Sequence, residues 1–394
     1  MTQSEFLQYF NPVSLKEIGF ELNKGFEKWG DKLIINLADT PLPQIDNTIS
    51  MAFIGITEDR ASVSNKGCSH TPDEVRRYFY PLMPQKTDIK ILDLGNLRLG
   101  SDVQNTYFAL GEVMAFLLER RITPVIIGGS NDLAIGAYRA YVNLSQIINI
   151  FALDAKFDLV GDDEPVSDEN FLHEIICSEP NYLFDYTHAG YQTYFVDSKA
   201  LDLLDDLRFE RLRLGQIQNN IERAEPLVRD ADMVVVDMNC VRASDAPSSP
   251  SPHGFYGEEL CKIVNYAGMS DKLTSIGFFG NNVLFDLGGR TSHIIAHAIY
   301  YFIDGYLWRK NDYPYNDDDN YIRFNVMLND FEDEIVFYKS KKSDRWWVQV
   351  PCTNEMKRKY MRHYMVPCLY SDYQSAGQGQ VPARWLVAYN KLNI

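Results

Sequence analysis

The sequence predicts an α/β protein whose doubly wound parallel sheet forms the middle of three layers. Two observations lead to this fold class: short, continuously apolar runs recur along the chain, and amphipathic helical patterns lie between them. Parallel strands covered on both faces are apolar throughout, and alternation with helices is the order that builds such a sheet. A third observation confines this fold to part of the chain, because after residue 312 the alternation gives way to strand-like runs separated by turns.

The apolar runs expected to form the sheet are short and bounded by polar or turn-forming residues. They occupy residues 51–56, 89–94, 123–127, 148–153, 193–196, 233–236 and 275–279. The helical patterns between them include residues 107–120, 222–229 and 258–267. In such a sheet a site forms in the crevice beyond the carboxyl ends of the strands. The residues that follow each strand are therefore the ones to examine for chemistry.

The chain divides into three expected parts. Residues 1–50 are a lead-in with a helix expected over 14–29, residues 51–312 are the α/β domain, and residues 313–394 are a small α+β appendage that begins at an acidic, turn-rich stretch. Turn residues and alternating patterns predict most of the appendage. Its expected elements are strands at 321–328, 334–338, 346–350 and 385–389, a hairpin tip at 339–344 and a helix at 354–364.

Composition limits the classes of partner. The 38 Lys and Arg against 54 Asp and Glu give a net charge of −16, which argues against nucleic acid as a ligand. The two candidate basic patches, Lys341–Lys342 and residues 357–359, are interpreted as solvated surface. No apolar run is long enough for a membrane span, no secretory signal is visible, and the six cysteines form no Cys-x-x-Cys pair. We expect a cytoplasmic protein.

Three of the predicted strands end in unusual polar segments. Residues 125–132 read Val-Ile-Ile-Gly-Gly-Ser-Asn-Asp, residues 152–158 read Ala-Leu-Asp-Ala-Lys-Phe-Asp, and residues 236–240 read Val-Asp-Met-Asn-Cys. Carboxylates that meet at one rim repel each other, by about 4 kcal/mol for a pair roughly 4 Å apart at an effective dielectric near 20. A positive group, either a metal ion or a lysine, is therefore expected among them.

These segments resemble the three signatures of the ureohydrolase superfamily, which includes arginase, agmatinase and formimidoylglutamase. The family motifs Gly-Gly-Asp-His-Ser, Asp-Ala-His-x-Asp and Asp-x-Asp occur in the same order, and residues 71–76 and 280–302 are also similar to family segments. The resemblance covers about residues 50–307 and is closest to formimidoylglutamase in residues 170–173 and 184–195. It implies an arginase-like fold with two manganese ions at the rim of the sheet.

The resemblance also implies that half of the metal ligands are missing. The degenerate positions are Asn131 and Lys156, which replace the two histidines, and Asn239, which replaces an aspartate, whereas Asp154, Asp158 and Asp237 are retained. Hydrolysis in this family needs a metal to lower the pKa of water, and an ammonium group is not a ligand. We interpret Lys156 as an internal substitute for the manganese charge. The alternative is a lysine that reaches solvent and leaves Asp154, Asp158 and Asp237 to bind one weak ion.

The histidines are weaker candidates. His173 matches a family active-site histidine, but without a metal-bound hydroxide it has nothing obvious to protonate, so we interpret it as a hydrogen-bonded rim residue. His293 and His297 have the i, i+4 spacing of a helical metal site but no evident third ligand. His188 and His253 are expected in loops at the rim.

The resulting expectation is an arginase/formimidoylglutamase-like pseudoenzyme that holds no metal cofactor and acts as a protein- or ligand-binding scaffold. A protein partner is expected on the aromatic-rich residues 313–394, and the family resemblance makes a homo-oligomer an expected possibility. One alternative is a manganese-dependent hydrolase of formimidoylglutamate-type or guanidino substrates with an altered metal site. Another is a small-molecule sensor that uses the old substrate cleft without turnover.

Overall fold

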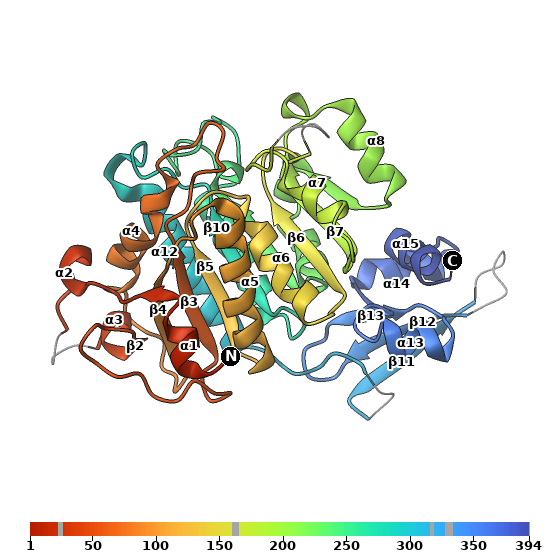
Figure 1. Ribbon diagram of the computed structural model, residues 1–394. Helices are drawn as coiled ribbons and strands as arrows, with labels where there is room; N and C mark the ends of the chain where they lie inside the picture. The colour runs from red at the N-terminus through yellow and green to blue at the C-terminus, as the bar shows by residue number, and fades with distance from the viewer. Residues whose placement is uncertain (23–26, 160–164, 316–318, 328–333, 394) are drawn as a thin grey trace.

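A large sheet covered by helices and a smaller, separate sheet make up the molecule (Figure 1). The structure, a computed structural model, describes residues 1–22, 27–159, 165–315, 319–327 and 334–393. The large sheet has the strand order β1-β4-β3-β5-β10-β9-β6-β7-β8, with β2 paired to β4. Its strand pairs are parallel, except that β1 runs antiparallel to β4. The predicted doubly wound α/β fold is therefore confirmed.

The strands of the large sheet are short, and most of the helices lie between them in sequence. The strands are β1 (Phe10–Asn11), β2 (Ile34–Ile35), β3 (Met51–Ile56), β4 (Ile91–Leu97), β5 (Thr123–Ile127), β6 (Ile148–Leu153), β7 (Leu183–Tyr191), β8 (Glu210–Arg213), β9 (Met233–Asp237) and β10 (Ser275–Phe279). The α-helices are α1 (Gln3–Leu7), α2 (Leu15–Ile18), α3 (Trp29–Lys32), α4 (Thr71–Phe79), α5 (Val103–Glu119), α6 (Leu133–Asn143), α7 (Phe171–Ile176), α8 (Ser198–Asp206), α9 (Leu214–Gln218), α10 (Ala224–Arg229), α11 (Gly257–Met269) and α12 (Arg290–Leu307). Short 3-10 helices are η1 (Cys68–His70), η2 (Thr193–Phe195), η3 (Ile221–Arg223), η4 (Met238–Cys240) and η5 (Leu287–Gly289).

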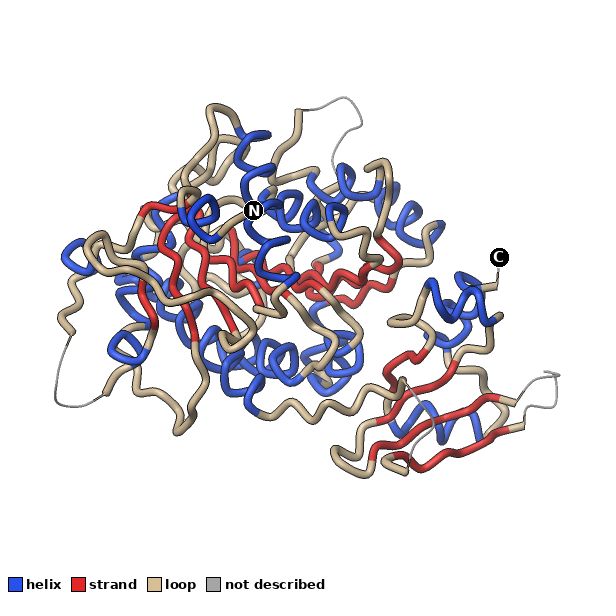
Figure 2. The backbone as a smooth tube through the Cα atoms, turned by 60° about the horizontal axis from the view of Figure 1, so that its bottom comes forward, coloured by secondary structure: helices blue, strands red, loops and turns tan. Residues whose placement is uncertain are grey.

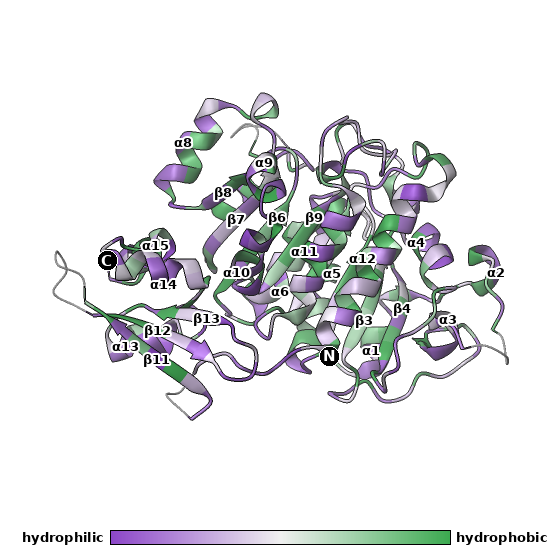
Figure 3. Cartoon of the chain, turned by 180° about the vertical axis from the view of Figure 1, so that it is seen from behind, coloured by the Kyte–Doolittle hydropathy of each residue, from purple (hydrophilic) through white to green (hydrophobic). Residues whose placement is uncertain are grey.

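Burial on both faces explains the continuous apolar runs. Every residue of β3, β5, β6 and β9 is buried, and successive side chains enter two different apolar clusters, one on each face. Helices α11 and α12 contribute to one cluster, and α5 and α6 contribute to the other. Figure 2 shows helices on both sides of the sheet, and Figure 3 shows its central strands as strongly hydrophobic. Removal of this apolar surface from water is the main force that assembles the three layers.

One predicted strand of the large sheet is wrong. The residues predicted as a strand at 193–196 instead begin with η2, and the strand at this place is β7, nine residues long. Its apolar pattern is interrupted by Asp185, Thr187 and His188, so it does not form a continuous apolar run in the sequence. Asp185 accepts a hydrogen bond from Lys391, and His188 is buried with its own partners, so the fold satisfies polar groups that the pattern alone could not explain.

The first 50 residues are joined to the large sheet. β1 and β2 both pair with β4, and Phe6 packs into one of the two apolar clusters. The helix expected over 14–29 is replaced by the short helices α2 and α3, and residues 23–26 of it lie outside the described ranges. α2 ends at Gly19, whose φ of 76° is a left-handed conformation that glycine adopts at little cost.

The C-terminal appendage is an antiparallel sheet with three helices. Its strands are β11 (Tyr321–Val326), β12 (Ile335–Ser340), β13 (Trp346–Gln349) and β14 (Met365–Cys368), in that order across the sheet. Its helices are α13 (Asn354–Lys359), α14 (Tyr370–Gly377) and α15 (Ala383–Leu392). The hairpin tip between β12 and β13 is confirmed, and the end of the strand predicted at 321–328 lies partly outside the described ranges.

Two predictions for the appendage need correction. The strand expected at 385–389 is part of helix α15, in which Trp385, Ala388 and Leu392 are buried at helical spacing against the appendage core. The helix expected over 354–364 stops at Lys359, and the chain then enters β14. The segment at 385–389 is a short apolar run, which does not distinguish helix from strand until its packing is known.

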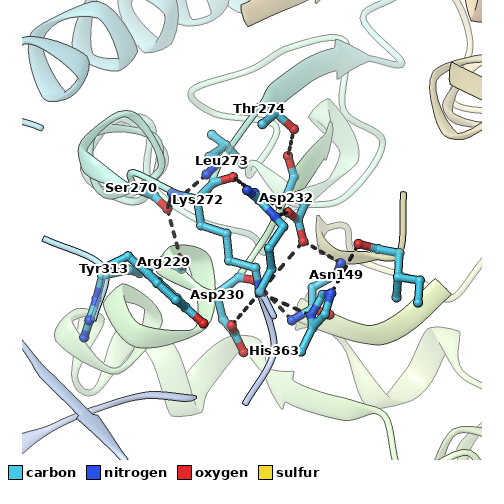
Figure 4. A network of polar contacts seen from close by, with 12 residues as sticks. Asn149, Arg229, Asp230, Asp232, Ser270, Lys272, Leu273, Thr274, Tyr313 and His363 are labelled. Atoms are coloured by element: carbon cyan, nitrogen blue, oxygen red, sulfur yellow. Dashed lines mark hydrogen bonds and ion pairs between the residues drawn. The ribbon is translucent and has the colours of Figure 1, made fainter. Parts of the chain in front are cut away.

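A buried polar network, which we call the junction network, joins the appendage to the large domain (Figure 4). Lys272 donates to Asp230 at 2.8 Å, and Arg362 donates to Asp232 at 2.6 Å. The second oxygen of Asp230 pairs with Arg384 at 3.2 Å, and that of Asp232 accepts from the backbone N–H of residue 149 at 2.9 Å. The network also includes His363, whose Nε2 lies 3.2 Å from the carbonyl oxygen of residue 147. All four carboxylate oxygens therefore have partners.

None of the helices in the described part of the chain combines the length and the apolar character that a membrane crossing requires.

Candidate functional site

The three polar segments predicted at strand ends come together at one rim of the large sheet. β5, β10, β9 and β6 are consecutive neighbours, so the residues after β5, β9 and β6 emerge from the same edge. β10, the strand between β5 and β9, is followed by Gly280, which has a φ of 75°. A Cβ atom there would lie 2.7 Å from Oδ1 of Asp237, so only glycine leaves room for that carboxylate.

Three buried aspartates form the centre of this rim site, which we define as Asn131, Asp154, Lys156, Asp158, Asp237 and Asn239. The local backbone sets their positions: Oδ1 of Asp154 accepts from the N–H groups of the next two residues, at 2.5 and 3.3 Å. Oδ1 of Asp237 accepts from the N–H of residue 239 at 2.7 Å and thereby caps η4. Oδ2 of Asp154 and Oδ1 of Asp158 are buried and have no hydrogen-bond partner among the residues that the structure describes. The cluster thus keeps unused acceptor capacity.

Burial and mutual repulsion disfavour charge on these carboxyl groups. Loss of hydration raises the pKa of Asp154 well above its usual range, and the nearby Asp158 raises it further. The pKa of Asp158 is raised to about 8, again mainly by burial, although Lys156 acts in the opposite direction. Burial and the charge of Asp154 likewise raise the pKa of Asp237. In the absence of another cation, protons would neutralise part of this cluster.

Asn131 joins the ends of β5 and β6. Its Nδ2 donates to Oδ2 of Asp158 at 3.0 Å, whereas its Oδ1 is buried without a partner. The adjacent Asp132 accepts a hydrogen bond from the hydroxyl of Tyr107 at 2.5 Å, and burial raises its pKa to about 6. The amide of Asn131 therefore occupies one side of Asp158 as a neutral donor.

Lys156 and Asn239 lie nearer to solvent than the aspartates. Nζ of Lys156 lies 3.1 Å from Oε1 of Glu169, and its side chain is 34% exposed. Burial works to lower the pKa of Lys156, but the charges of Asp158 and Asp154 outweigh it, and the net pKa shift is upward. Lys156 thus interacts with the aspartates by longer-range electrostatic attraction. Its one ion pair among the described residues is with Glu169. Asn239 is half-buried and contributes its backbone N–H to Asp237.

The histidines are distributed over several places. His173 is half-buried on α7, and its Nε2 lies 3.4 Å from Sγ of Cys177. The expected loop position of His188 is wrong, because it lies within β7 and is buried. Its two nitrogens contact the Tyr186 hydroxyl at 2.8 Å and the carbonyl oxygen of residue 154 at 3.1 Å. Burial lowers the pKa of His188 to about 3, so its neutral ring serves to position the Asp154 loop.

The remaining histidines do not assemble a metal site. His293 and His297 have ring centroids 4.6 Å apart on α12, as their spacing implies. His253 lies in an exposed loop. Within the described ranges, no three or more His, Cys, Asp or Glu side chains are arranged to hold a metal ion.

The residues of the rim site do not fit a binuclear manganese centre. Such a centre requires nitrogen or oxygen ligands with free lone pairs, and an ammonium group has none. Lys156 offers a cation at one histidine position, and Asn131 turns its donor group toward Asp158 at the other. Asp154, Asp158 and Asp237, the fallback ligands expected from the sequence, do not form a three-residue metal group among the described residues, although Asp154 and Asp158 each keep a buried oxygen without a partner there.

A hollow of about 690 Å³ lies beside this site; of the two histidines expected in rim loops, His253 is part of its lining and His188 is not. Its lining includes Gln192, Arg213, Arg242, His253 and Tyr256. The backbone N–H of Gln192 donates to the carbonyl oxygen of residue 155, and its side chain donates to the carbonyl oxygen of His253 at 2.9 Å. The hollow is formed by segments that follow β7, β8 and β9, so no single segment of the sequence predicts it.

Comparisons with known proteins agree with the fold. The family model described as the arginase family matches residues 49–304. The chain is 26% identical over 275 residues to a formimidoylglutamase from Staphylococcus haemolyticus, covering 66% of this chain and 88% of that one. It is also 26% identical over 277 residues to a formimidoylglutamase from Geobacillus thermodenitrificans, covering 65% and 83%.

Solved structures show the same fold at lower sequence identity. Formimidoylglutamase from Bacillus subtilis superposes with a TM-score of 0.64 at 18% identity, covering 75% of this chain and 98% of that one. Formiminoglutamase from Trypanosoma cruzi with bound manganese gives a TM-score of 0.62 at 17% identity, covering 68% and 97%. Residues 305–394, which contain the whole appendage sheet, lie beyond the range that the family model matches.

Proposed function

The chain belongs to the arginase family, and we propose that it is a catalytically impaired member that acts as a binding scaffold. One observation carries the proposal: the two positions that hold histidine ligands in the family are occupied by side chains with other partners. Asn131 donates to Asp158, and Lys156 pairs with Glu169. Family chemistry needs a metal-bound hydroxide near neutral pH, and these replacements remove both imidazole donors from the ligand set.

The chain's own residues stabilise the rim in a different way. The backbone N–H groups that follow Asp154 and Asp237 hold the carboxylates in place, and the amide of Asn131 donates to Asp158. The neutral His188 ring contacts the backbone carbonyl of Asp154 and helps to hold this loop in place. These contacts hold the carboxylates of the rim in place without a metal ion.

The alternative function is a hydrolase of formimidoylglutamate-type or guanidino substrates that uses a single manganese ion. It is favoured by the buried, unpartnered oxygens of Asp154, Asp158 and Asn131, because buried polar atoms without partners are uncommon and often mark an unseen ion or water. In this alternative, Asp154, Asp158 and Asp237 would hold the ion, which would supply the charge that lowers the pKa of water.

Metal content separates the two functions. We expect protein grown with manganese and purified without chelators to contain less than about a tenth of an equivalent, measured by inductively coupled plasma mass spectrometry. The triple variant Asn131→His, Lys156→His and Asn239→Asp, which restores the family ligands, should contain clearly more manganese. A variant with Lys341→His and Lys342→His on the appendage hairpin controls for nonspecific binding to added histidines.

Turnover provides the second test. The scaffold proposal predicts no manganese-stimulated hydrolysis of formimidoylglutamate, agmatine or arginine by the native chain. Steady turnover, or about one or two equivalents of tightly bound manganese in the native protein, would overturn the proposal and establish the hydrolase.

A further inference from the structure

The structure contains a basic hollow at the junction between the appendage and the large domain, on the opposite edge of the sheet from the rim site. Two adjoining hollows of about 540 and 500 Å³ share Ile147, Tyr182 and Lys359 in their linings. We call them together the basic seam. Ile147 precedes β6 and Tyr182 precedes β7, whereas Asp154 follows β6. The six residues of β6 therefore separate the seam from the rim by about 20 Å.

The charge of the basic seam is opposite to that of the whole chain. Among the residues that the structure describes, its lining contains the cations Arg358, Lys359, Arg362 and Lys391 and no carboxylate side chain. The chain as a whole carries 54 acidic against 38 basic residues. A surface without acids is therefore unusual here, and its potential favours an anionic ligand.

Two of these cations are not used by the fold. Arg362 pairs with Asp232 in the junction network, and Lys391 pairs with Asp185 at 2.6 Å. Arg358 and Lys359 are exposed on α13 and form no ion pair with any residue in the described ranges. Lys359 lies 5.0 Å from the ring centroid of Tyr360. These two charges remain available to a partner.

Apolar surface lies beside the charges. Met361 is 54% exposed, and the half-buried rings of Tyr182, Phe184 and Tyr360 line the same seam. Aromatic, methionine and arginine side chains are enriched at protein-binding surfaces, although lysine is not. A free inorganic anion would use the charges but leave this apolar surface exposed to water.

We propose that the basic seam binds an acidic peptide segment of a partner protein, one that carries apolar side chains among its carboxylates. The segment's carboxylates would pair with Arg358 and Lys359, and its apolar side chains would cover Met361 and Tyr182. Since the family model ends at residue 304, the seam depends on a part of the chain outside the matched range. This proposal rests on the scaffold function and adds the class of partner. Its test measures neither metal content nor turnover, so the seam proposal and the scaffold function can fail independently.

The test begins with selection of short random displayed peptides on the full-length protein. We expect acidic peptides that contain aromatic or aliphatic residues, with affinities that fall as ionic strength rises. In fluorescence anisotropy with the selected peptides, the double variant Arg358→Glu and Lys359→Glu should weaken binding by at least about tenfold. The matched variant Lys341→Glu and Lys342→Glu makes the same charge change on the exposed hairpin tip and should leave affinity unchanged. Thermal unfolding of both variants verifies that they fold.

Several outcomes would overturn the proposal. Selection of no peptides, or of peptides that bind the Arg358 and Lys359 variant equally well, would show that the seam is not the site. If both double variants lost the same affinity for the peptides, the loss would come from the change in net charge and not from the seam. Full competition by inorganic phosphate or polyglutamate would indicate a simple anion site. A dimer that the seam variant alone converts to monomer in sedimentation would show that a second copy of the chain occupies it.

Discussion

The rim site and the junction network are both built around buried aspartates, but only the junction network satisfies them. Asp230 and Asp232 have a partner for every carboxylate oxygen, including three cations. At the rim, Asp154 and Asp158 each keep one buried oxygen without a partner. A buried charge is tolerated when it is paired and hydrogen-bonded, and otherwise it favours its neutral form. The junction therefore has the electrostatics of a structural element, whereas the rim keeps buried acceptor oxygens that the described residues do not satisfy.

The largest expected effect is the loss of a paired carboxylate at the junction. Asp232→Ala would leave Arg362 and Lys272 without their shared partner, so we expect the free energy of unfolding to fall by about 3–5 kcal/mol. Chemical denaturation measures this value. Asp202→Ala, an exposed position on α8, is the control and should change stability by less than about 0.5 kcal/mol. A loss at Asp232 no larger than the control would show that the junction network does not stabilise the fold.

A smaller effect is expected from pH at the same junction. Burial lowers the pKa of His363 well below 6.5, and the charges of Lys272, Arg362 and Lys391 lower it further. Below pH 6.5 the unfolded chain takes up a proton at this residue and the folded chain does not. Stability should therefore fall with acidification below about pH 6.5, by at most about 1.4 kcal/mol per pH unit. His363→Gln, which does not titrate, should reduce this slope, and an unchanged slope would assign the pH dependence to other groups.

At the rim, removal of a carboxylate is expected to stabilise the protein. In the folded protein the pKa of Asp158 is raised to about 8, so between about pH 4 and pH 8 the unfolded chain is ionised here while the folded chain holds a proton. The free energy of unfolding should therefore fall as pH rises through this range. Asp158→Asn keeps an acceptor for Asn131 and removes the charge, so we expect a gain of about 1–2 kcal/mol at pH 8 in chelator-treated protein. A marked loss would mean that the Asp158 carboxylate has a charged partner in the folded protein.

The smallest effect is expected at Lys156. Its pair with Glu169 is partly exposed, and such pairs contribute less than about 1 kcal/mol, so Lys156→Ala should change the free energy of unfolding by no more than this. A double-mutant cycle with Glu169→Ala isolates the pair. If Lys156→Ala instead costs several kcal/mol or creates manganese binding, Lys156 does replace the lost metal charge, as its sequence position led us to expect.

Much of the sheet and the composition of the rim could be predicted from the sequence. Continuous apolar runs identified β3, β5, β6, β9 and β10, because strands buried on both faces leave little choice of side chain. The residues after β5, β6 and β9 followed directly as the candidate site, since parallel strands end at the same edge.

Elements that depend on packing could not be predicted in this way. β7 contains polar residues whose partners come from distant segments, such as Lys391 for Asp185. The apolar run around Trp385 was consistent with either a strand or a helix, and burial against the appendage core selected the helix. Some aromatic residues of the appendage, such as Trp347 and Trp385, are buried in its own core, whereas Tyr370 is exposed. The basic seam is assembled from the amino ends of β6 and β7 together with α13 and α15.

The sequence by itself determined the fold class and the chemical identity of the rim, because apolar periodicity and residue type are local properties. Tertiary structure decided which buried charges are paired: Lys156 faces Glu169, Asn131 faces Asp158, and Asp232 meets Arg362 from a segment 130 residues away. Electrostatic energy in a protein depends on the distance between groups and on their exposure to water, and the chain order specifies neither.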